Sequence, residues 1–313
     1  MTLNNICVLG GGGFVGSHLV PLLAARGLRV RVPTRHRERC KHLLVLPGVE
    51  VVETSLHDPA RLRELFEGMD AVINLVGILH ERRPGDFQRA HVDLPREVIA
   101  ACAASGVRRL LHMSALGAEA DSRSRYQQSK SAGEALVLAA SNLDTTVFRP
   151  SVIFGPGDSF LSLFADLLRL APVVPLAGAG ARFQPVFVGD VARAFADALE
   201  NRDTFGHRYD LCGPGIHTLA ELVRLTASTL GLCRVVLPLG EAPSYWFARL
   251  MELKPGDKIM TRDNHYAMLR DNVCPGDCPH PFGAPTPLES VIGYLKEDGP
   301  RRGYTAFRAH AGR

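Results

Sequence analysis

A run of four glycines, set between a short apolar segment and an amphipathic one, constrains this chain more than any other feature. Residues 6–9 read Ile-Cys-Val-Leu, which suits a buried parallel strand, and apolar residues at helical spacing follow from residue 14. The glycines form GxxGxxG at positions 10, 13 and 16, and GxGxxG at positions 11, 13 and 16. Such a turn needs positive φ, close approach of the backbone to a pyrophosphate, and close packing of helix on sheet. We therefore predict a dinucleotide-binding loop, with helix amides facing the phosphates, made by Gly10, Gly13, Phe14, Val15 and Gly16.

Short strands and helices alternate along the first half of the chain. Asp58 and Pro59 open one of the helices as its cap and first residue. Alternation of this kind implies βαβ units with right-handed crossovers. We predict an α/β fold of the Rossmann type, a doubly wound parallel sheet with helices on both faces. The predicted strands cover residues 6–9, 29–33, 49–53, 71–76, 109–113 and 145–149, and the helices cover 14–26, 58–67, 93–105 and 125–141.

After about residue 155 proline and glycine become denser and the alternation weakens. Residues 160–176 read as an amphipathic helix with a proline-rich end, and 185–200 as a strand followed by a helix capped by Asp190. Further helices are predicted near 218–231 and 242–252. We predict a dinucleotide-binding domain of residues 1–155, to which 183–205 return, and a smaller mixed C-terminal domain of residues 156–182 and 206–296 for the substrate or a partner. The polar, basic residues 297–313 are predicted to form a flexible tail.

The composition excludes several classes of protein. The chain has 313 residues, 46% of them hydrophobic and 22% charged, which is ordinary globular usage and excludes disorder for most of its length. A net charge of +4 without a basic stripe interleaved with aromatic residues argues against a nucleic-acid partner. The sequence has no run of 18 apolar residues and no secretion signal, so we expect a cytoplasmic protein without a membrane span.

The seven cysteines are scattered and odd in number, which is typical of free thiols in a reducing cytoplasm. Cys274, Cys278 and His280 lie close together in the sequence, as metal ligands would. Three prolines interrupt this segment, however, and there is no second pair of ligands. We therefore predict no metal.

The end of the second strand indicates which dinucleotide binds. About 19 residues after Gly16, an NAD site usually has an acidic residue that accepts a hydrogen bond from the ribose 2′-hydroxyl. This chain has Thr34-Arg35-His36-Arg37 instead, and residues 31–41 carry a net charge of +4. Because a guanidinium binds a 2′-phosphate that a carboxylate would repel, we predict NADP(H) over NAD(H), bound by Thr34, Arg35 and Arg37. A solvated basic loop is the alternative. Asp58 follows the third strand, where its side chain could contact the adenine, and its alternative role is to cap the following helix.

Tyr126 and Lys130 stand at i and i+4, so a helix presents them on one face. A nearby ammonium favours the phenolate and lowers the pKa of a tyrosine. A tyrosine in such a setting can act as a general acid or base on a hydroxyl or carbonyl group. The alternative is a packed aromatic residue and an ordinary surface lysine.

Together these elements resemble the short-chain dehydrogenase/reductase superfamily, in its extended or atypical branch. Asn74-Leu75-Val76-Gly77 and Arg149-Pro150-Ser151-Val152-Ile153-Phe154-Gly155 add to the resemblance, which covers about residues 1–205. It implies that Leu75, Val76 and Gly77 contact the cofactor and that Pro150 and Val152 lie beside the nicotinamide. It also implies that Lys130 holds the nicotinamide ribose and that Tyr126 is the catalytic acid or base.

A narrower resemblance spans nearly the whole chain. The passages HVDLPREVIAAC, HMSALGA with YQQSK, and TRDNHYAMLRDNVC are similar to bacterial relatives of the NADPH-binding accessory subunit of respiratory complex I. This resemblance implies tightly held NADP(H) and a structural, assembly or undefined redox role. A respiratory complex then becomes a partner, and the protein would sit peripherally at the inner face of the respiratory membrane.

One departure from the superfamily bears on catalysis. Active members carry a serine cluster after the fifth strand, whereas this chain has Ser114-Ala115-Leu116-Gly117. If Ser114 is only the first member of that cluster, a substrate oxygen loses one hydrogen-bond donor, which can cost about 10²–10³ in rate. Ser122 and Ser124 are alternative donors, and Ser114 is retained as the candidate catalytic serine.

Two functions stay open. The first is an NADP(H)-dependent oxidoreductase or nucleotide-sugar epimerase/dehydratase-like enzyme, with Tyr126 as acid or base and an unknown small-molecule substrate. The second is a structural or assembly module that binds NADP(H) and associates with respiratory complex I with little or no turnover. A dense polar set near the C-terminus either binds the substrate or holds helices together: Arg262, Asp263, His265, Arg270 and Asp271.

Overall fold

The computed structural model of the chain describes residues 3–252, 261–276 and 280–296. These residues form two compact units. Unit 1 consists of the described residues within Met1–Pro150, Val188–Leu211 and Cys274–Ala284, and unit 2 of those within Ser151–Phe187, Cys212–Val273 and Pro285–Arg313. The predicted tail, 297–313, lies outside the described residues.

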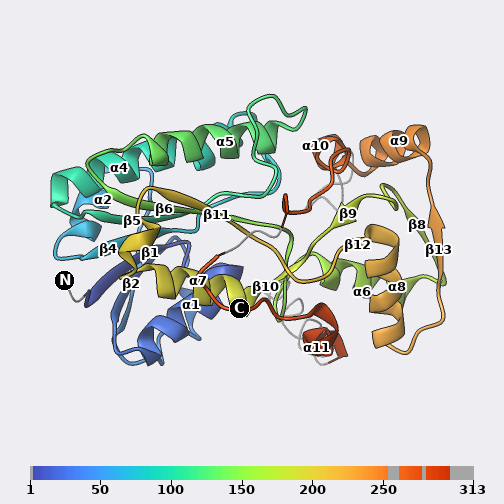
Figure 1. The fold of residues 1–313 in the computed structure, drawn as a ribbon, viewed down its shortest axis with the longest axis horizontal. Coiled ribbons are helices and arrows are strands. Elements are labelled where there is room, and N and C mark those ends of the chain that lie inside the picture. The colour runs from blue at the N-terminus through green and yellow to red at the C-terminus, as the bar shows by residue number, and fades with distance from the viewer. Residues whose placement is uncertain (1–2, 253–260, 277–279, 297–313) are drawn as a thin grey trace. The chain divides into compact units, whose positions relative to one another are not determined.

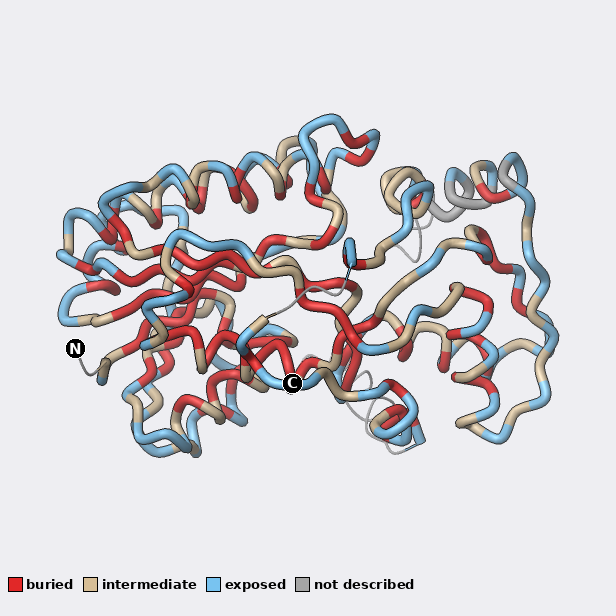
Figure 2. The backbone as a smooth tube through the Cα atoms, viewed as in Figure 1, coloured by how far each residue is buried: buried red, intermediate tan, exposed pale blue. Residues whose placement is uncertain are grey.

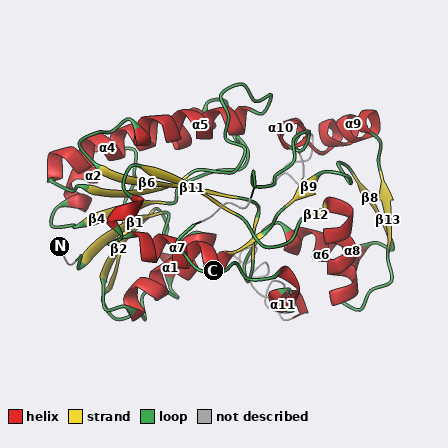
Figure 3. Cartoon of the chain, viewed as in Figure 1, coloured by secondary structure: helices red, strands yellow, loops and turns green. Residues whose placement is uncertain are grey.

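Unit 1 is built on a seven-stranded sheet in which every paired strand is parallel, and this confirms the predicted fold class (Figures 1 and 3). The strand order is β11-β6-β5-β4-β1-β2-β3. Successive strands are added on one side of β1 up to β3 and on its other side from β4 onward, so the order of addition reverses between β1 and β4. The strands are β1 (Asn5–Leu9), β2 (Arg29–Thr34), β3 (Val49–Glu53), β4 (Ala71–Asn74), β5 (Arg109–Met113), β6 (Asp144–Pro150) and β11 (His207–Leu211).

Helices cover both faces of this sheet (Figure 1). Helices α1 (Phe14–Ala25) and α7 (Val188–Ala198) lie on one face, and α2 (Pro59–Phe66), α4 (Leu94–Ser105) and α5 (Arg125–Leu138) lie on the other. The strands between the two layers are largely buried (Figure 2) because their residues are apolar on both faces. Shorter elements are the 3₁₀ helices η1 (Arg37–Cys40) and η3 (Arg202–Thr204), helix α3 (Asp86–Gln88) and the π-helical turn η2 (Arg89–Asp93).

Three sequence-based details of unit 1 were wrong. The seventh strand, β11, comes from residues assigned to the second domain, and it joins the sheet by pairing with β6, from His207 with Thr146 to Leu211 with Pro150. Strand β4 ends at Asn74 instead of residue 76, which leaves 75–77 in a turn. Asp190 lies inside the first turn of α7 and pairs with Arg193 instead of capping the helix.

Unit 2 consists of short helices and, among its described residues, three two-stranded sheets, β10-β7, β12-β9 and β13-β8. The predicted helix over 160–176 ends at Leu170, because Pro172 cannot continue it, and Val173–Leu176 form a strand. The strands are β7 (Ile153–Phe154), β8 (Val173–Leu176), β9 (Arg182–Phe183), β10 (Val186–Phe187), β12 (His217–Thr218) and β13 (Val235–Pro238), and the helices are α6 (Leu161–Leu170), α8 (Leu219–Thr229), α9 (Glu241–Glu252), α10 (Arg262–Ala267) and α11 (Leu288–Val291).

The cysteines differ from the expectation of free thiols. Cys7, Cys40, Cys102 and Cys233 are free, but Cys212 and Cys274 are each disulfide-bonded. Cys278 lies outside the described residues. The described part of the chain holds no group of three candidate metal ligands. No helix in the described part of the chain is long and apolar enough to cross a membrane.

Arg109 is a charged residue inside unit 1. The residue is only 3% exposed, and its guanidinium donates to the carbonyl oxygens of Asp144, Ala198 and Leu199. It also donates to the hydroxyl oxygens of Thr146 and Thr204, and burial lowers its pKa to about 10. One side chain therefore joins β5, β6, the end of α7 and η3.

We expect Arg109→Leu to lower the free energy of unfolding by at least about 3 kcal/mol, because several buried acceptors lose their donor. The matched control is Arg108→Leu, since the Arg108 side chain is exposed and lies 3.9 Å from Asp144. This control should change stability by no more than about 0.5 kcal/mol. Urea unfolding followed by circular dichroism compares the two variants, and equal losses would contradict the role assigned to Arg109.

Candidate functional site

The glycine loop places two glycines where no other residue fits. Gly10 follows β1 directly with φ +78°, and a Cβ added there would lie 3.2 Å from the backbone of Leu75 and Val76, which follow β4. A Cβ added to Gly16 would lie 2.4 Å from the carbonyl oxygen of Gly11. Helix α1 therefore packs directly on the loop, and Gly13 stands at its N-cap with no side chain to cap it. Phe14 and Val15 form its first turn, so the free amides of this turn are available to an anion.

The basic segment after β2 packs against the glycine loop at both of its ends. A Cβ added to Gly12 would lie 2.3 Å from Cys40 Sγ, and one added to Gly11 would lie 2.9 Å from Val32 Cγ1. Cys40 is 1% exposed and ends η1. The residues between Val32 and Cys40 therefore start and finish against the glycine loop, which places the arginines predicted from the sequence beside the predicted pyrophosphate site.

Three arginines of this segment pair with no side chain that the structure describes. Arg31 pairs with Glu50 at 2.9 Å, and Lys41 pairs with Glu38. The side chains of Arg35, Arg37 and Arg39 are exposed, and none makes a hydrogen bond or ion pair with another residue that the structure describes. Thr34 Oγ1 accepts a hydrogen bond from the His36 amide at 3.2 Å and fixes the turn that carries Arg35.

Asp58 has the structural role that the sequence predicted. Its carboxylate accepts a hydrogen bond from the Ala60 amide at 2.9 Å and caps α2, with Pro59 at the first helical position. One carboxylate oxygen is used in this cap, and the adenine contact remains a prediction.

The turn after β4 meets the helix that carries Tyr126 and Lys130. Lys130 Nζ donates to the carbonyl oxygen of Met113, at the end of β5, at 2.7 Å. A Cβ added to Gly77 would lie 3.5 Å from this nitrogen. Lys130 is 3% exposed, and its burial lowers its pKa to about 8 although Glu134 opposes the shift. The structure thus brings Gly77 beside Lys130, which lies one helical turn after Tyr126 on α5.

Ser114 follows Met113 directly and carries a buried hydroxyl without a partner. Its side chain is 3% exposed, and Ser114 Oγ makes no hydrogen bond within the described structure. Ser122 and Ser124 are already engaged, because Ser122 donates to Gln127 and Ser124 Oγ accepts from the Gln127 amide as the cap of α5. Of the three serines, Ser114 therefore has a hydroxyl left for a ligand.

An ionic cluster fixes the far half of α5 to the sheet. Glu134 is 2% exposed and pairs with Arg149 of β6 at 2.7 Å and with Arg208 of β11 at 3.2 Å. Arg149 also donates to the carbonyl oxygen of Ala118. Arg149 begins the segment that the resemblance places beside the nicotinamide, and in the structure its side chain holds α5. Pro150 accepts a hydrogen bond from Leu116, whereas Val152 belongs to unit 2 and donates to Asn272.

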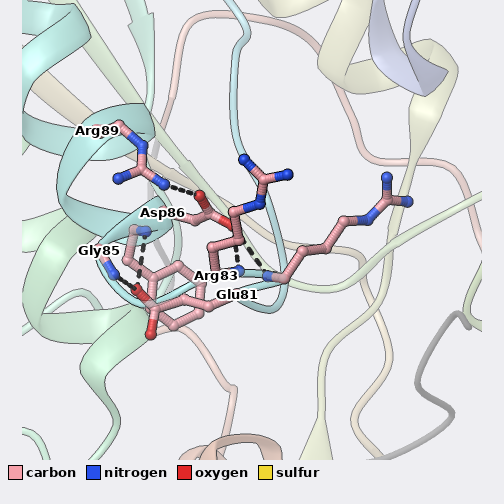
Figure 4. A network of polar contacts seen from close by, with 7 residues as sticks. Glu81, Arg83, Gly85, Asp86 and Arg89 are labelled. Atoms are coloured by element: carbon pink, nitrogen blue, oxygen red, sulfur yellow. Dashed lines mark hydrogen bonds and ion pairs between the residues drawn. The ribbon is translucent and has the colours of Figure 1, made fainter. Parts of the chain in front are cut away.

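The loop between β4 and η2 is held by two carboxylates (Figure 4). Glu81 accepts hydrogen bonds from the amides of Gly85 and Phe87, and Asp86 accepts from the amides of Arg82 and Arg83. Asp86 also pairs with Arg89, and Glu81 pairs with Arg125, the residue before Tyr126, at 3.1 Å. These bonds rigidify the loop and join it to the start of α5.

Two buried histidines of the site were missed from the sequence. His91 and His112 are each 2% exposed, and burial is the main cause that lowers their pKa, to about 3 for His91 and well below 6.5 for His112. The positive charge of Lys130 contributes to both shifts. Asn74 Nδ2 lies 3.3 Å from His112 Nδ1. His112 follows two leucines and His91 lies in a mixed segment between Arg89 and Asp93, and neither pattern distinguishes a site residue from a core residue.

The polar set near the C-terminus is largely structural. Thr261 caps α10 together with Asn264, and Asp271 pairs with Arg182 at 3.2 Å. Asn272 accepts hydrogen bonds from Ser151 Oγ and the Val152 amide. His265 is 6% exposed, and Arg262, Asp263 and Arg270 all have partners. These contacts favour the interpretation in which the set holds unit 2 together.

Comparison with known proteins gives the following matches. Residues 6–212 match the NAD dependent epimerase/dehydratase family. The chain is 32% identical over 291 residues to NADH dehydrogenase [ubiquinone] 1 alpha subcomplex subunit 9, mitochondrial, of Rattus norvegicus, covering 90% of this chain and 77% of that protein. It is 36% identical over 188 residues to ceramide reductase of Caulobacter vibrioides, covering 60% of this chain and 58% of that protein.

Solved structures share the fold. Gox2253 superposes with a TM-score of 0.75 at 24% identity, covering 96% of this chain and 99% of the other. MoeE5 in complex with UDP-glucose and NAD superposes with a TM-score of 0.70 at 22% identity, with the same coverage. At these identities the likeness concerns the fold alone.

The two buried histidines predict an acid sensitivity. In the unfolded chain a histidine binds a proton below about pH 6.5, whereas the folded chain keeps His91 and His112 neutral at that pH. The unfolded state then binds more protons, so we expect stability to fall as pH drops below 6.5, by up to about 1.4 kcal/mol per pH unit for each histidine.

Urea unfolding at pH 7, 6 and 5 measures this slope. His112→Asn, which keeps an acceptor for Asn74, should reduce the slope by about half, and His207→Asn, an exposed histidine, should leave it unchanged. The same slope in all three proteins would contradict the prediction.

Proposed function

Because this chain belongs to the NAD-dependent epimerase/dehydratase family, we propose that it binds NADP(H) and acts as an oxidoreductase or epimerase of the short-chain dehydrogenase/reductase type. The family match confirms the resemblance drawn from the glycine loop and the Tyr126–Lys130 pair. The observation that carries the cofactor preference is the set of unpaired guanidinium groups at Arg35, Arg37 and Arg39, attached at both ends to the glycine loop. Three free cations at this point suit a 2′-phosphate and offer nothing specific to a 2′-hydroxyl.

The site residues fit a bound dinucleotide. Gly10 and Gly16 keep the loop free of side chains, and the first turn of α1 offers its amides to the pyrophosphate. Lys130, buried and cationic at neutral pH, would hold the nicotinamide ribose. Tyr126 then exchanges a proton with a substrate oxygen, and Ser114 Oγ supplies a hydroxyl for the same region. The nicotinamide supplies or accepts the hydride at its C4 position when it is bound.

A second function is favoured by the relatives. The match to a mitochondrial NADH dehydrogenase subunit covers 90% of the chain, and Ser114 is followed by Ala115 and Leu116 where active members carry further serines or threonines. The chain would then be an assembly module that holds NADP(H) as a structural ligand and sits peripherally on a respiratory complex. Such a module would co-sediment with respiratory membranes and turn over no substrate.

Fluorescence titration with NADPH and NADH tests the cofactor proposal. We expect tighter binding of NADPH, and we expect Arg35→Ala to weaken it at least about tenfold, since a charge-assisted hydrogen bond contributes about 1.5–3 kcal/mol. The affinity for NADH should change less than about twofold, because NADH has no 2′-phosphate for the Arg35 guanidinium to contact.

The matched control is Lys41→Ala, a cation of the same segment that is paired with Glu38. It should leave the affinity for both nucleotides unchanged. Preference of the parent protein for NADH, or equal losses in Arg35→Ala and Lys41→Ala, would refute the proposed phosphate site.

A further inference from the structure

We propose that His91 is a positioning residue that anchors the first turn of α5 to the turn after β4 and shields the Lys130 ammonium from water. This inference rests on the proposed function, in which Lys130 and Tyr126 face the nicotinamide. It concerns a residue of η2, outside the glycine loop and outside the Tyr126–Lys130 pair.

Both ring nitrogens of His91 are used, and their partners fix the tautomer. The Ile78 amide donates to His91 Nε2 at 3.1 Å, so this nitrogen is an acceptor. Ser129 Oγ donates to the carbonyl oxygen of Tyr126 at 2.8 Å and therefore accepts from His91 Nδ1–H, also at 2.8 Å. The imidazole is thus a neutral bridge from the turn that holds Gly77 to the turn of α5 that holds Tyr126.

The ring of His91 is also packed against Tyr126. Phe87 stacks on His91 with ring centroids 5.5 Å apart, and both rings meet Tyr126 edge to face, at 5.9 Å and 5.5 Å. Phe87 is held by the bond from its amide to Glu81, in the loop shown in Figure 4. The rigid loop therefore sets the place of Phe87, and Phe87 with His91 sets the place of the Tyr126 ring.

The backbone of His91 approaches α5 more closely than any residue except glycine would allow. A Cβ added to Gly133 would lie 1.8 Å from the His91 carbonyl oxygen. On the other side, a Cβ added to Gly77 would lie 3.7 Å from His91 Nε2 and 3.5 Å from Lys130 Nζ. The imidazole and the ammonium thus share the space beside Gly77, and the imidazole occupies volume that water would otherwise fill.

The charges around Lys130 require a neutral neighbour at this place. The titratable groups coupled to Lys130 among the described residues are His91 from η2, His112 from β5 and Glu134 from α5 itself, and Tyr126 meets His91 edge to face. Glu134 is shared with the two arginines described above, so it compensates the ammonium only in part. A protonated His91 would add a second cation, and its low pKa, about 3, excludes this at neutral pH.

Direct titration of Lys130 without any nucleotide tests the inference. The chain has five lysines, at positions 41, 130, 254, 258 and 296, so protein labelled with ¹³C at lysine Cε gives few signals, and Lys130→Met identifies that of Lys130. We expect a midpoint of about 8 in the parent protein. In His91→Ala we expect a rise of at least about one unit, because water reaches the ammonium.

Two further variants complete the experiment. Ser129→Ala removes one partner of the imidazole and should raise the Lys130 midpoint measurably, but by less than half as much as His91→Ala. Val98→Ala, a buried change in α4 away from the site, should lower the melting temperature and leave the midpoint unchanged. The variants His91→Ala and Val98→Ala thus separate positioning from general loss of stability.

An unchanged Lys130 midpoint in His91→Ala, or an equal shift in Val98→Ala, would overturn the proposal. If His91→Ala does not fold, Ser129→Ala decides, and no upward shift there would also overturn it. Because the titration uses no cofactor, a failure of the proposed NADPH preference leaves this result standing, and the two failures can be told apart.

Discussion

The contact between Gly16 of α1 and the backbone of Gly11 is the constraint on which the rest of unit 1 depends. It leaves no room for a Cβ, so the helix lies directly on the turn that ends β1. The same glycine turn also packs against two other segments. Gly10 lies close to the backbone of Leu75 and Val76 after β4, and Gly12 lies close to Cys40 at the end of η1. Backbone packing in one loop therefore fixes the predicted pyrophosphate site, the residues that follow β4 and the basic segment, all at the carboxyl edge of one parallel sheet.

A second set of contacts places the chemistry of α5 against that edge. Lys130 reaches the carbonyl oxygen of Met113 between β5 and Ser114, while Glu134 holds the far half of the helix to β6 and β11. The burial that lowers the pKa of Lys130 and leaves Ser114 Oγ without a partner is a cost in stability. Costs of this kind concentrate at sites that receive a ligand, and this supports the proposed cofactor site.

The sequence allowed prediction of the parts of the fold that depend on local pattern. Strand β5 has the predicted bounds, Arg109–Met113, and the predicted helix over 125–141 is α5, because turn residues and apolar spacing determine both. Strand β11 was assigned to the wrong domain because its pairing with β6 is a non-local property. The positions of Tyr126 and Lys130 on one helix followed from their spacing, but the bridge through His91 joins residues 13 and 38 apart in the chain.

The central claim is that the glycine loop and the three unpaired arginines together hold a phosphorylated dinucleotide. The most direct measurement is identification of the nucleotide that co-purifies with the chain, released by denaturation and analysed by mass spectrometry. The account predicts NADP⁺ or NADPH, at close to one molecule per chain and absent from a variant in which Arg35, Arg37 and Arg39 are replaced. Recovery of NAD⁺ or NADH in its place, unaffected by these replacements, would contradict the account.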